Sequence, residues 1–361
     1  MNLLSTDASV SSQKPHFILL DGLRGIAALI ILLFHYLEMI YVNDYESNWL
    51  GHGYLAVDFF FCLSGFVIAY AYDGRIDQIG IKKFFTNRLV RLHPLVVFGT
   101  LIGLIGYLFN PFIPDPASSG MAKIIFASLF SLILLPFPFI DYRGGGLFPF
   151  NTPSWSLFFE YIANIIYAVV LSRIARSKLL VLCLLAGAFL VLCASRAGWL
   201  IGGWDILSVT DGIARVSFSF LAGMLIYRYQ LIIPNKQNYL ILCLLFTAVF
   251  FFPHHNGDWI SECIIVMLVF PLFLSIAAGT SVTKKASVFL SFIGNLSYPL
   301  YMTHITSVWL FGDYYTMHQP NGIKLVGIVT GLMLFNLLIA YVVMRWVDTP
   351  LRKKLTALQR K

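Results

Sequence analysis

Charged residues are scarce in this sequence for its length. Asp, Glu, Lys and Arg together make up 12% of the 361 residues, whereas 58% are hydrophobic. A soluble domain carries about 25% charged residues, so this chain has too little polar side-chain surface to face water. No long polar or Pro/Ser-rich linker separates the apolar stretches. This excludes a chain of several soluble domains and predicts one helical bundle over residues 1–361.

Cysteine is also rare, and its pattern argues against a disulfide framework. The five cysteines form neither a CxxC pair nor a Cys/His cluster, and all fall in apolar stretches. We therefore expect small buried apolar side chains. His254 and His255 stand beside Asp258 in a short polar stretch, where solvated loop residues are the expectation and a metal site is the less favoured alternative. The sequence thus predicts no metal.

The basic residues are not arranged for binding nucleic acid. The chain has 25 Lys and Arg against 17 Asp and Glu, a net charge of +8. The Lys and Arg occur in short clusters between apolar stretches, where the positive-inside rule places them in a membrane protein. We therefore expect the lipid bilayer as a partner and no nucleic acid.

Long apolar stretches predict an all-α polytopic membrane protein. About 17 to 25 apolar residues are needed for a helix to span the bilayer. In the third stretch, Gly99 and Gly103 are spaced for close helix packing. The eleven candidates are residues 23–41, 54–72, 94–110, 122–140, 154–172, 179–195, 211–229, 239–252, 260–279, 288–311 and 323–345.

The basic clusters predict how many of these stretches cross. With a cytoplasmic N-terminus, the basic loop 73–93 lies inside, as the positive-inside rule prefers. If 122–140 also crossed, the basic stretch 172–178 and every later basic loop would lie outside. We therefore predict about ten transmembrane helices, a re-entrant or interfacial segment at 122–140, and both termini in the cytoplasm. A polar N-terminal tail at 1–16 and a basic C-terminal tail at 346–361 complete the chain.

Ionisable residues inside the apolar stretches require an explanation, because each costs about 2.5 kcal/mol or more at membrane depth. Arg24 stands eleven positions before His35 in the first stretch. On a helix this is about 16 Å along the axis, and about three turns, so both side chains point from nearly the same face. A snorkelling arginine with a core histidine is one interpretation, and a polar pathway through the membrane is the other.

Two further elements carry charge at or near the membrane. Arg88 and Arg91 are at i, i+3 on one helix face, and two guanidinium groups suit phosphate groups, although ordinary positive-inside charge explains them as well. Glu160 follows Ser154 and Trp155 in an apolar helix and lies too far along for a capping box. A buried glutamate needs a cation or a proton relay.

Weaker candidates occur in three other apolar stretches and near the C-terminus. Asp58 lies in the second stretch, Arg215 in the seventh and His304 in the tenth, while Asp348 follows the last. Each of these side chains could simply hold helices together.

Taken in order, these elements resemble the acyltransferase-3 family of membrane O-acyltransferases, which decorate bacterial surface and extracellular glycans. Pro299 departs from the family's pattern and could kink its helix. The chain resembles the stand-alone form of the family, without a fused extracytoplasmic domain. It is similar to the family in the Arg-x10-His of Arg24 and His35, the Phe-Phe-x-Leu-Ser-Gly-Phe signature within 57–66, the Arg-x-x-Arg of Arg88 and Arg91, the Ser-Trp-Ser-Leu-x-x-Glu of 154–160 and the Ser-Tyr-x-x-Tyr-x-x-His of 297–304.

The resemblance implies an enzyme of the bacterial cytoplasmic (inner) membrane. It would transfer an acyl group, most often acetyl, from cytoplasmic acyl-CoA to a hydroxyl of a cell-surface or extracellular polysaccharide or of its lipid-linked precursor. Arg24, Arg88 and Arg91 would hold the acyl-CoA donor, with acetyl-CoA the expected form.

His35 would serve as general base or as acyl carrier. Either Glu160 or Asp58 would fix its tautomer. A transporter of an acylated or acidic solute is the competing hypothesis, since it explains intramembrane charge equally well. The residues implied in substrate binding or support are Ser64, Ser154, Trp155, Tyr301 and His304.

Overall fold

The computed structural model describes residues 16–42, 44–112, 116–140, 145–236, 238–255 and 257–359. Most of these residues are helical, and the only strand-like pairings among them are two isolated bridges, Gly146 with Asp205 and Asn235 with Thr280. The predicted all-α fold is confirmed. The predicted N-terminal tail lies outside the described residues, except for its last residue.

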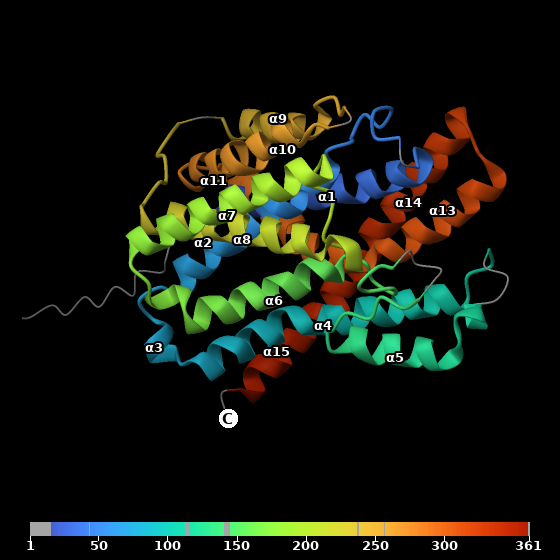
Figure 1. Ribbon diagram of the computed structural model, residues 1–361, viewed down its shortest axis with the longest axis horizontal. Helices are drawn as coiled ribbons and strands as arrows, with labels where there is room; N and C mark the ends of the chain where they lie inside the picture. The colour runs from blue at the N-terminus through green and yellow to red at the C-terminus, as the bar shows by residue number, and fades with distance from the viewer. Residues whose placement is uncertain are drawn as a thin grey trace, which may run out of the picture.

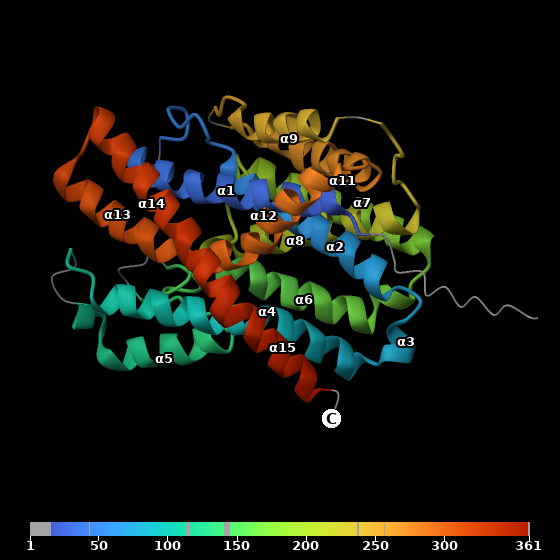
Figure 2. The same ribbon diagram turned by 180° about the vertical axis from the view of Figure 1, so that it is seen from behind.

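The helices form one bundle with α1, α2 and α8 at its centre (Figure 1). In both Figure 1 and Figure 2, α9, α10 and α11 lie along one side, and α4, α5, α6 and α15 along the other. The helices are α1 (Ile18–Ile40), α2 (Ala56–Tyr72), α3 (Ile76–Ile79), α4 (Ile81–Leu108), α5 (Met121–Leu132), α6 (Ser154–Val169), α7 (Arg176–Ala197), α8 (Val209–Arg228), α9 (Tyr239–Ala248), α10 (Trp259–Ile264), α11 (Phe270–Ala278), α12 (Lys284–Thr303), α13 (Ile305–His318), α14 (Gly322–Val343) and α15 (Thr349–Leu358).

Seven helical runs in the described chain are long and apolar enough to cross a membrane. They contain α1, α2, α4, α7, α8, the continuous run of α10 and α11, and the run from α14 to α15. The other predicted spans correspond to α6 and α9, which are shorter, and to α12 with α13, which is interrupted. The chain is therefore a polytopic membrane protein, while the count of ten and the orientation of the termini stay predictions.

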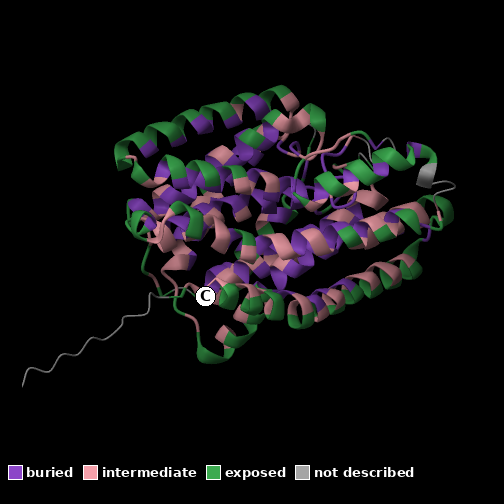
Figure 3. Cartoon of the chain, turned by 90° about the horizontal axis from the view of Figure 1, so that it is seen from below, coloured by how far each residue is buried: buried purple, intermediate pink, exposed green. Residues whose placement is uncertain are grey.

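The outer surface of the bundle is apolar. Along α7, Leu184, Leu185 and Leu192 are 65%, 62% and 66% exposed. Figure 3 shows such exposed positions along the outer faces of the helices, around a buried interior. In water, extended apolar patches promote association, whereas lipid accommodates them. This surface is that of an integral membrane protein.

Glycines allow α4 to approach its neighbours closely. A Cβ atom at Gly99 would overlap the carbonyl oxygen of Met302 at the end of α12, and one at Gly103 would overlap that of Phe150. A Cβ at Gly65 in α2 would likewise overlap the backbone of α8. Small residues permit this packing between membrane helices. The close packing predicted from the glycine spacing of the third stretch is confirmed.

The segment 122–140 contains a short helix and no full-length span. α5 has 12 residues, about 18 Å at 1.5 Å per residue, which is shorter than the bilayer core of about 30 Å. Residues 135–140 form no helix, and α5 runs back beside α4 in Figure 1. A helix of this length fits a segment that does not cross, although its place relative to the membrane remains a prediction.

The structure corrects two predicted boundaries in the middle of the chain. α4 begins at Ile81 rather than at residue 94, so Arg88 and Arg91 lie in the helix itself and not in a loop. The predicted span 288–311 is divided into α12 and α13 at His304. This break follows Pro299, which cannot donate a backbone hydrogen bond within the helix.

The predicted C-terminal tail is also helical. α14 continues through a π-helical turn, Met344–Asp348, into α15 (Figure 2). The wide turn lies directly before Pro350, whose missing N–H disturbs a regular helix. Arg352 pairs with Asp348 one turn earlier and stabilises this end. The tail therefore packs as part of the bundle, where α15 contacts α4.

Candidate active site

Two cavities adjoin inside the bundle. The first, here called the arginine cavity, has a volume of about 170 Å³ and is lined by Arg24, Arg88, Arg91 and Arg352. The second, the histidine cavity, has a volume of about 450 Å³ and is lined by His35. The side chains of Val57 and Tyr301 line both cavities. The two cavities are therefore neighbours, with these two side chains at their common boundary.

Glu160 lies in the arginine cavity and not beside His35. Its carboxylate accepts hydrogen bonds from the Arg88 guanidinium at 2.5 Å and from the Ser64 hydroxyl at 2.7 Å. The cation that a buried glutamate requires is thus Arg88. The expectation that Glu160 fixes the tautomer of His35 disagrees with this geometry, because both of its contacts are in the other cavity.

The arginine cavity keeps a surplus of positive charge. Arg24 donates to the Ser297 hydroxyl at 3.0 Å and to the Gly294 carbonyl at 2.7 Å, which fixes it on α12. Arg91 has no ion-pair partner among the described residues, and its side chain is open to the cavity. Arg352, which the sequence did not single out, adds a fourth guanidinium. Such a cluster attracts anions, phosphates above all.

In the histidine cavity, the carboxylate beside His35 is Glu38. The Nδ1 atom of His35 donates to Oε2 of Glu38 at 3.0 Å, and the Tyr45 hydroxyl donates to Oε1 at 3.0 Å. Burial, together with the Glu38 carboxylate, raises the pKa of Tyr45, so the phenol stays protonated and remains a donor. Sequence reasoning missed Glu38, although its i, i+3 spacing from His35 places both on one helix face.

His304 stacks against His35 from the break between α12 and α13. The ring centroids are 5.4 Å apart and the planes are 24° from parallel. His304 Nδ1 lies 2.9 Å from the Tyr301 carbonyl oxygen and donates to it. Its Nε2 atom is buried and has no partner within the described residues. The His304 ring therefore packs against His35 and keeps one buried nitrogen without a partner among the described residues.

Asp58 is paired with Arg215 and is not available to His35. The guanidinium donates to both carboxylate oxygens, with Nη2 2.6 Å from Oδ2 and Nε 3.2 Å from Oδ1. Both side chains are buried, and Arg215 also donates to the Tyr54 carbonyl at 3.1 Å. This pair links α2 to α8. The expectation that Asp58 orients His35 is therefore replaced by a role in holding helices together.

The other predicted residues lie in the walls of the two cavities or, in the case of Ser154, next to them in the chain. Trp155 lies under the Arg215 guanidinium, whose carbon is 5.2 Å from the ring centre, and lines the histidine cavity. The Tyr301 hydroxyl shares a 2.8 Å hydrogen bond with Ser156. The Ser154 hydroxyl is buried without a partner among the described residues. These contacts fix the boundary between the cavities.

The predicted relation between Arg24 and His35 is confirmed. Arg24 contacts α12 through Gly294 and Ser297, and His35 stacks on His304, the residue that follows α12. Both side chains therefore face the same neighbouring helix. Arg24 lines the arginine cavity and His35 lines the histidine cavity, so α1 contributes one polar side chain to each cavity.

The histidines near residue 254 differ from the prediction. His254 is 2% exposed and lies close to His52 and Glu262, whereas a solvated loop residue was expected. His255 is exposed, as predicted. The five cysteines are free and lie within the bundle, four of them buried and Cys243 partly so, which confirms the expectation of small buried side chains.

Comparison with known proteins identifies the family. The family model described as "Acyltransferase domain" matches residues 17–345. A Rhizobium radiobacter protein described as protein 2 in the picA locus is 37% identical over 196 residues, which are 51% of this chain and 98% of that protein. No solved structure matches.

Two larger relatives match over almost the whole chain. Peptidoglycan O-acetyltransferase OatA of Listeria monocytogenes is 22% identical, over 92% of this chain and 55% of that protein. O-acetyltransferase OatA of Staphylococcus aureus is 24% identical, over 93% of this chain and 57% of that protein. The chain thus spans a little over half the length of these relatives. Because the family model covers nearly all of the chain, the chain belongs to the acyltransferase-3 family of membrane O-acyltransferases.

Proposed function

We propose that this protein transfers an acyl group, acetyl in the first instance, from cytoplasmic acyl-CoA to a hydroxyl of a cell-surface or extracellular polysaccharide or its lipid-linked precursor. The observation that supports this most directly is the pair of adjoining cavities, one rich in arginine and the other holding His35. The protein would lie in the bacterial inner membrane with both termini in the cytoplasm.

The arginine cavity supplies the donor site. Arg88, Arg91 and Arg352 would bind the phosphate groups of acyl-CoA, because a guanidinium forms two parallel hydrogen bonds to phosphate. The acyl end would then point toward Val57 and Tyr301, where the cavities adjoin. Arg24 and His35 are about 16 Å apart along α1. The extended pantetheine arm is of similar length, so the thioester at its end can reach His35.

His35 acts as the general base. Because Nδ1–H is held by Glu38, Nε2 carries the lone pair that takes the proton from the acceptor hydroxyl. The hydroxyl oxygen forms a bond to the thioester carbonyl carbon, and the carbon–sulfur bond breaks. The released CoA thiolate takes the proton from His35, which restores the base. Glu38 stabilises the imidazolium formed between these steps.

The histidine cavity supplies the acceptor site. Tyr45, Trp155, Trp204 and Trp309 line it, and such side chains combine a flat apolar face with a polar tip. These features suit a sugar ring, which has apolar faces and a rim of hydroxyls. The name of the Listeria relative, a peptidoglycan O-acetyltransferase, also supports a carbohydrate acceptor.

The test is acyl transfer by purified protein in liposomes supplied with labelled acetyl-CoA and a polysaccharide acceptor. His35→Ala should reduce label transfer and CoA release by about 10²- to 10⁴-fold while acetyl-CoA binding persists. His318→Ala, a change in an exposed histidine at the end of α13, should match wild type. Transfer by His35→Ala at the wild-type rate would refute the general base. Accumulation of label inside the vesicles without CoA release would favour transport instead.

The donor site is tested in the same system. Arg88→Ala or Arg91→Ala should raise the KM for acetyl-CoA by about 10- to 150-fold, since a hydrogen bond to a charged group contributes about 1.5–3 kcal/mol. Lysine at either position should rescue only partly, because it lacks the forked geometry. Arg176→Ala, an exposed arginine at the start of α7, is the matched control. Unchanged KM values in both alanine variants would contradict the donor assignment.

A further inference from the structure

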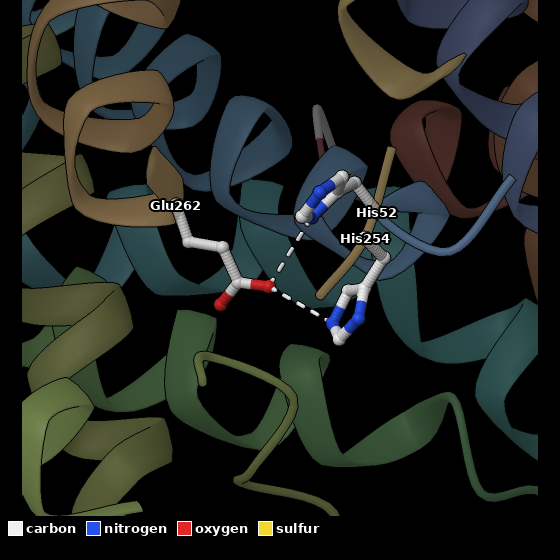
Figure 4. A group of neighbouring side chains, drawn as sticks. All are labelled: His52, His254 and Glu262. Atoms are coloured by element: carbon white, nitrogen blue, oxygen red, sulfur yellow. Dashed lines mark hydrogen bonds and ion pairs between the residues drawn. The ribbon is translucent and has the colours of Figure 1, made fainter. Parts of the chain in front are cut away.

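A buried cluster of His52, His254 and Glu262 lies outside the catalytic groups. The three residues are 0%, 2% and 0% exposed. They come from separate segments: His52 precedes the turn at the start of α2, His254 lies in the loop before α10, and Glu262 is in α10. Figure 4 shows both imidazole rings beside one oxygen of the carboxylate. The fold thus brings together two nitrogen ligands and an oxygen ligand.

The spacing of these atoms is close to that of a metal site. His52 Nδ1 is 3.2 Å and His254 Nε2 is 3.7 Å from Oε1 of Glu262. All three donor atoms lie within 4.8 Å of one another. Ligands about 2.0–2.1 Å from a tetrahedral zinc ion are about 3.3–3.4 Å apart. Small side-chain movements are therefore enough for the three atoms to bind one ion.

Arg215, a guanidinium that interacts electrostatically with Glu262, is already paired with Asp58. In the described part of the chain, no Lys or Arg forms an ion pair with Glu262, and a buried carboxylate without a cation is costly. Tyr54 donates to Oε1, so a phenol and two imidazoles share one oxygen. The Leu200 N–H donates to the other oxygen, Oε2, and fixes the carboxylate. A bound cation would satisfy the crowded oxygen and both imidazoles together.

The outer nitrogens of the two histidines support the same interpretation. His52 Nε2 and His254 Nδ1 are buried and have no hydrogen-bond partner among the described residues. Oδ2 of Asp258 lies 4.0 Å from His52 Nε2, beyond hydrogen-bond distance, so it would have to move closer to orient the ring as carboxylates do for histidines that bind metals.

We propose that His52, His254 and Glu262 bind a zinc ion, with the Tyr54 hydroxyl facing its fourth position. Two imidazoles and a carboxylate are a ligand set that zinc takes from proteins. This proposal replaces the expectation of no metal that the sequence suggested. The ion would join the segment before α2 to the loop before α10. It would thereby fix the part of the histidine cavity wall that Tyr54 forms.

The test measures metal in the full-length protein, purified without a polyhistidine tag and dialysed against zinc-free buffer. Wild type should hold about one zinc ion per chain. His255→Ala, a change in the exposed neighbouring histidine, should hold the same amount. His254→Ala and Glu262→Gln should lose nearly all of it. Equal zinc in wild type and His254→Ala would mean adventitious binding and would overturn the proposal.

A second measurement does not depend on how well the variants fold. Chelator-treated wild-type protein is titrated with Zn²⁺ while its Tm is followed. A ligand that binds only the folded state raises Tm as its concentration increases, so the Tm of wild type and of His255→Ala should rise. Chelator-treated wild type whose Tm does not respond to Zn²⁺ and which regains no metal would also overturn the proposal.

Discussion

Replacing Glu38 by glutamine tests the proposed catalytic pair with little change in shape. Glu38 accepts one hydrogen bond from His35 and one from Tyr45, each at 3.0 Å. Glutamine keeps the size and one acceptor oxygen but loses the negative charge. That charge matters most when His35 becomes an imidazolium, which occurs only as the acceptor hydroxyl is deprotonated. The substitution should therefore lower kcat.

The size of the effect follows from the contact that is weakened. A hydrogen bond to a charged group contributes about 1.5–3 kcal/mol, which corresponds to a fall in kcat of about 10- to 150-fold. The KM for acetyl-CoA should stay near the wild-type value, because the donor arginines line the other cavity. Glu160→Gln is the matched control. This substitution alters the partner of Arg88 and should therefore change the KM for acetyl-CoA, whereas kcat should stay nearly the same.

A double-mutant cycle then shows whether Glu38 acts through His35. His35→Ala should reduce label transfer by about 10²- to 10⁴-fold. If Glu38 only supports His35, adding Glu38→Gln to His35→Ala should cause no further loss of transfer rate. The effects of substitutions at two contacting residues that act as one unit do not add. Single-turnover transfer of labelled acetyl groups gives the rates. Wild-type kcat in Glu38→Gln, or fully additive losses in the double variant, would refute the reasoning.

Three further predictions concern the donor site, the helix core and the topology. Arg352→Ala should raise the KM for acetyl-CoA, whereas the exposed neighbour in Lys353→Ala should not; equal KM values would remove α15 from the donor site. Asp58→Asn leaves Arg215 buried without its partner and should lower the free energy of unfolding by about 3–5 kcal/mol; an unchanged denaturation midpoint in detergent would contradict this. A reporter at Ser177 should read cytoplasmic, and an extracytoplasmic signal would make 122–140 a true span.

Relations within one helix could be predicted from the sequence. The spacing of Arg24 and His35 fixed their common face, because the helix period alone determines it. The same rule would also have identified Glu38, which follows His35 at i, i+3, but the sequence analysis did not apply it there. The helical fold also followed from local composition and length. These features depend only on residues close together in the chain.

Partners from distant segments could not be predicted in the same way. Glu160 and Asp58 were both candidates for His35, but the fold places one beside Arg88 and the other beside Arg215. No periodicity links a carboxylate in one helix to a guanidinium far away in the sequence. The tail at 346–361 gave no apolar signal, so its helix and the place of Arg352 in the donor cavity were missed.

One loop connects the proposed base to the proposed zinc site. Tyr45 donates to Glu38, and its ring lies edge-on to that of Tyr54 with centroids 6.4 Å apart. Tyr54 in turn donates to Glu262. Zinc removal should therefore loosen the wall that holds Tyr45, and part of the orientation of Glu38 should be lost with it. Since the ion would touch neither substrate, kcat should fall more than the KM for acetyl-CoA changes, in the same direction as Glu38→Gln. An effect confined to that KM would instead separate the zinc site from the base.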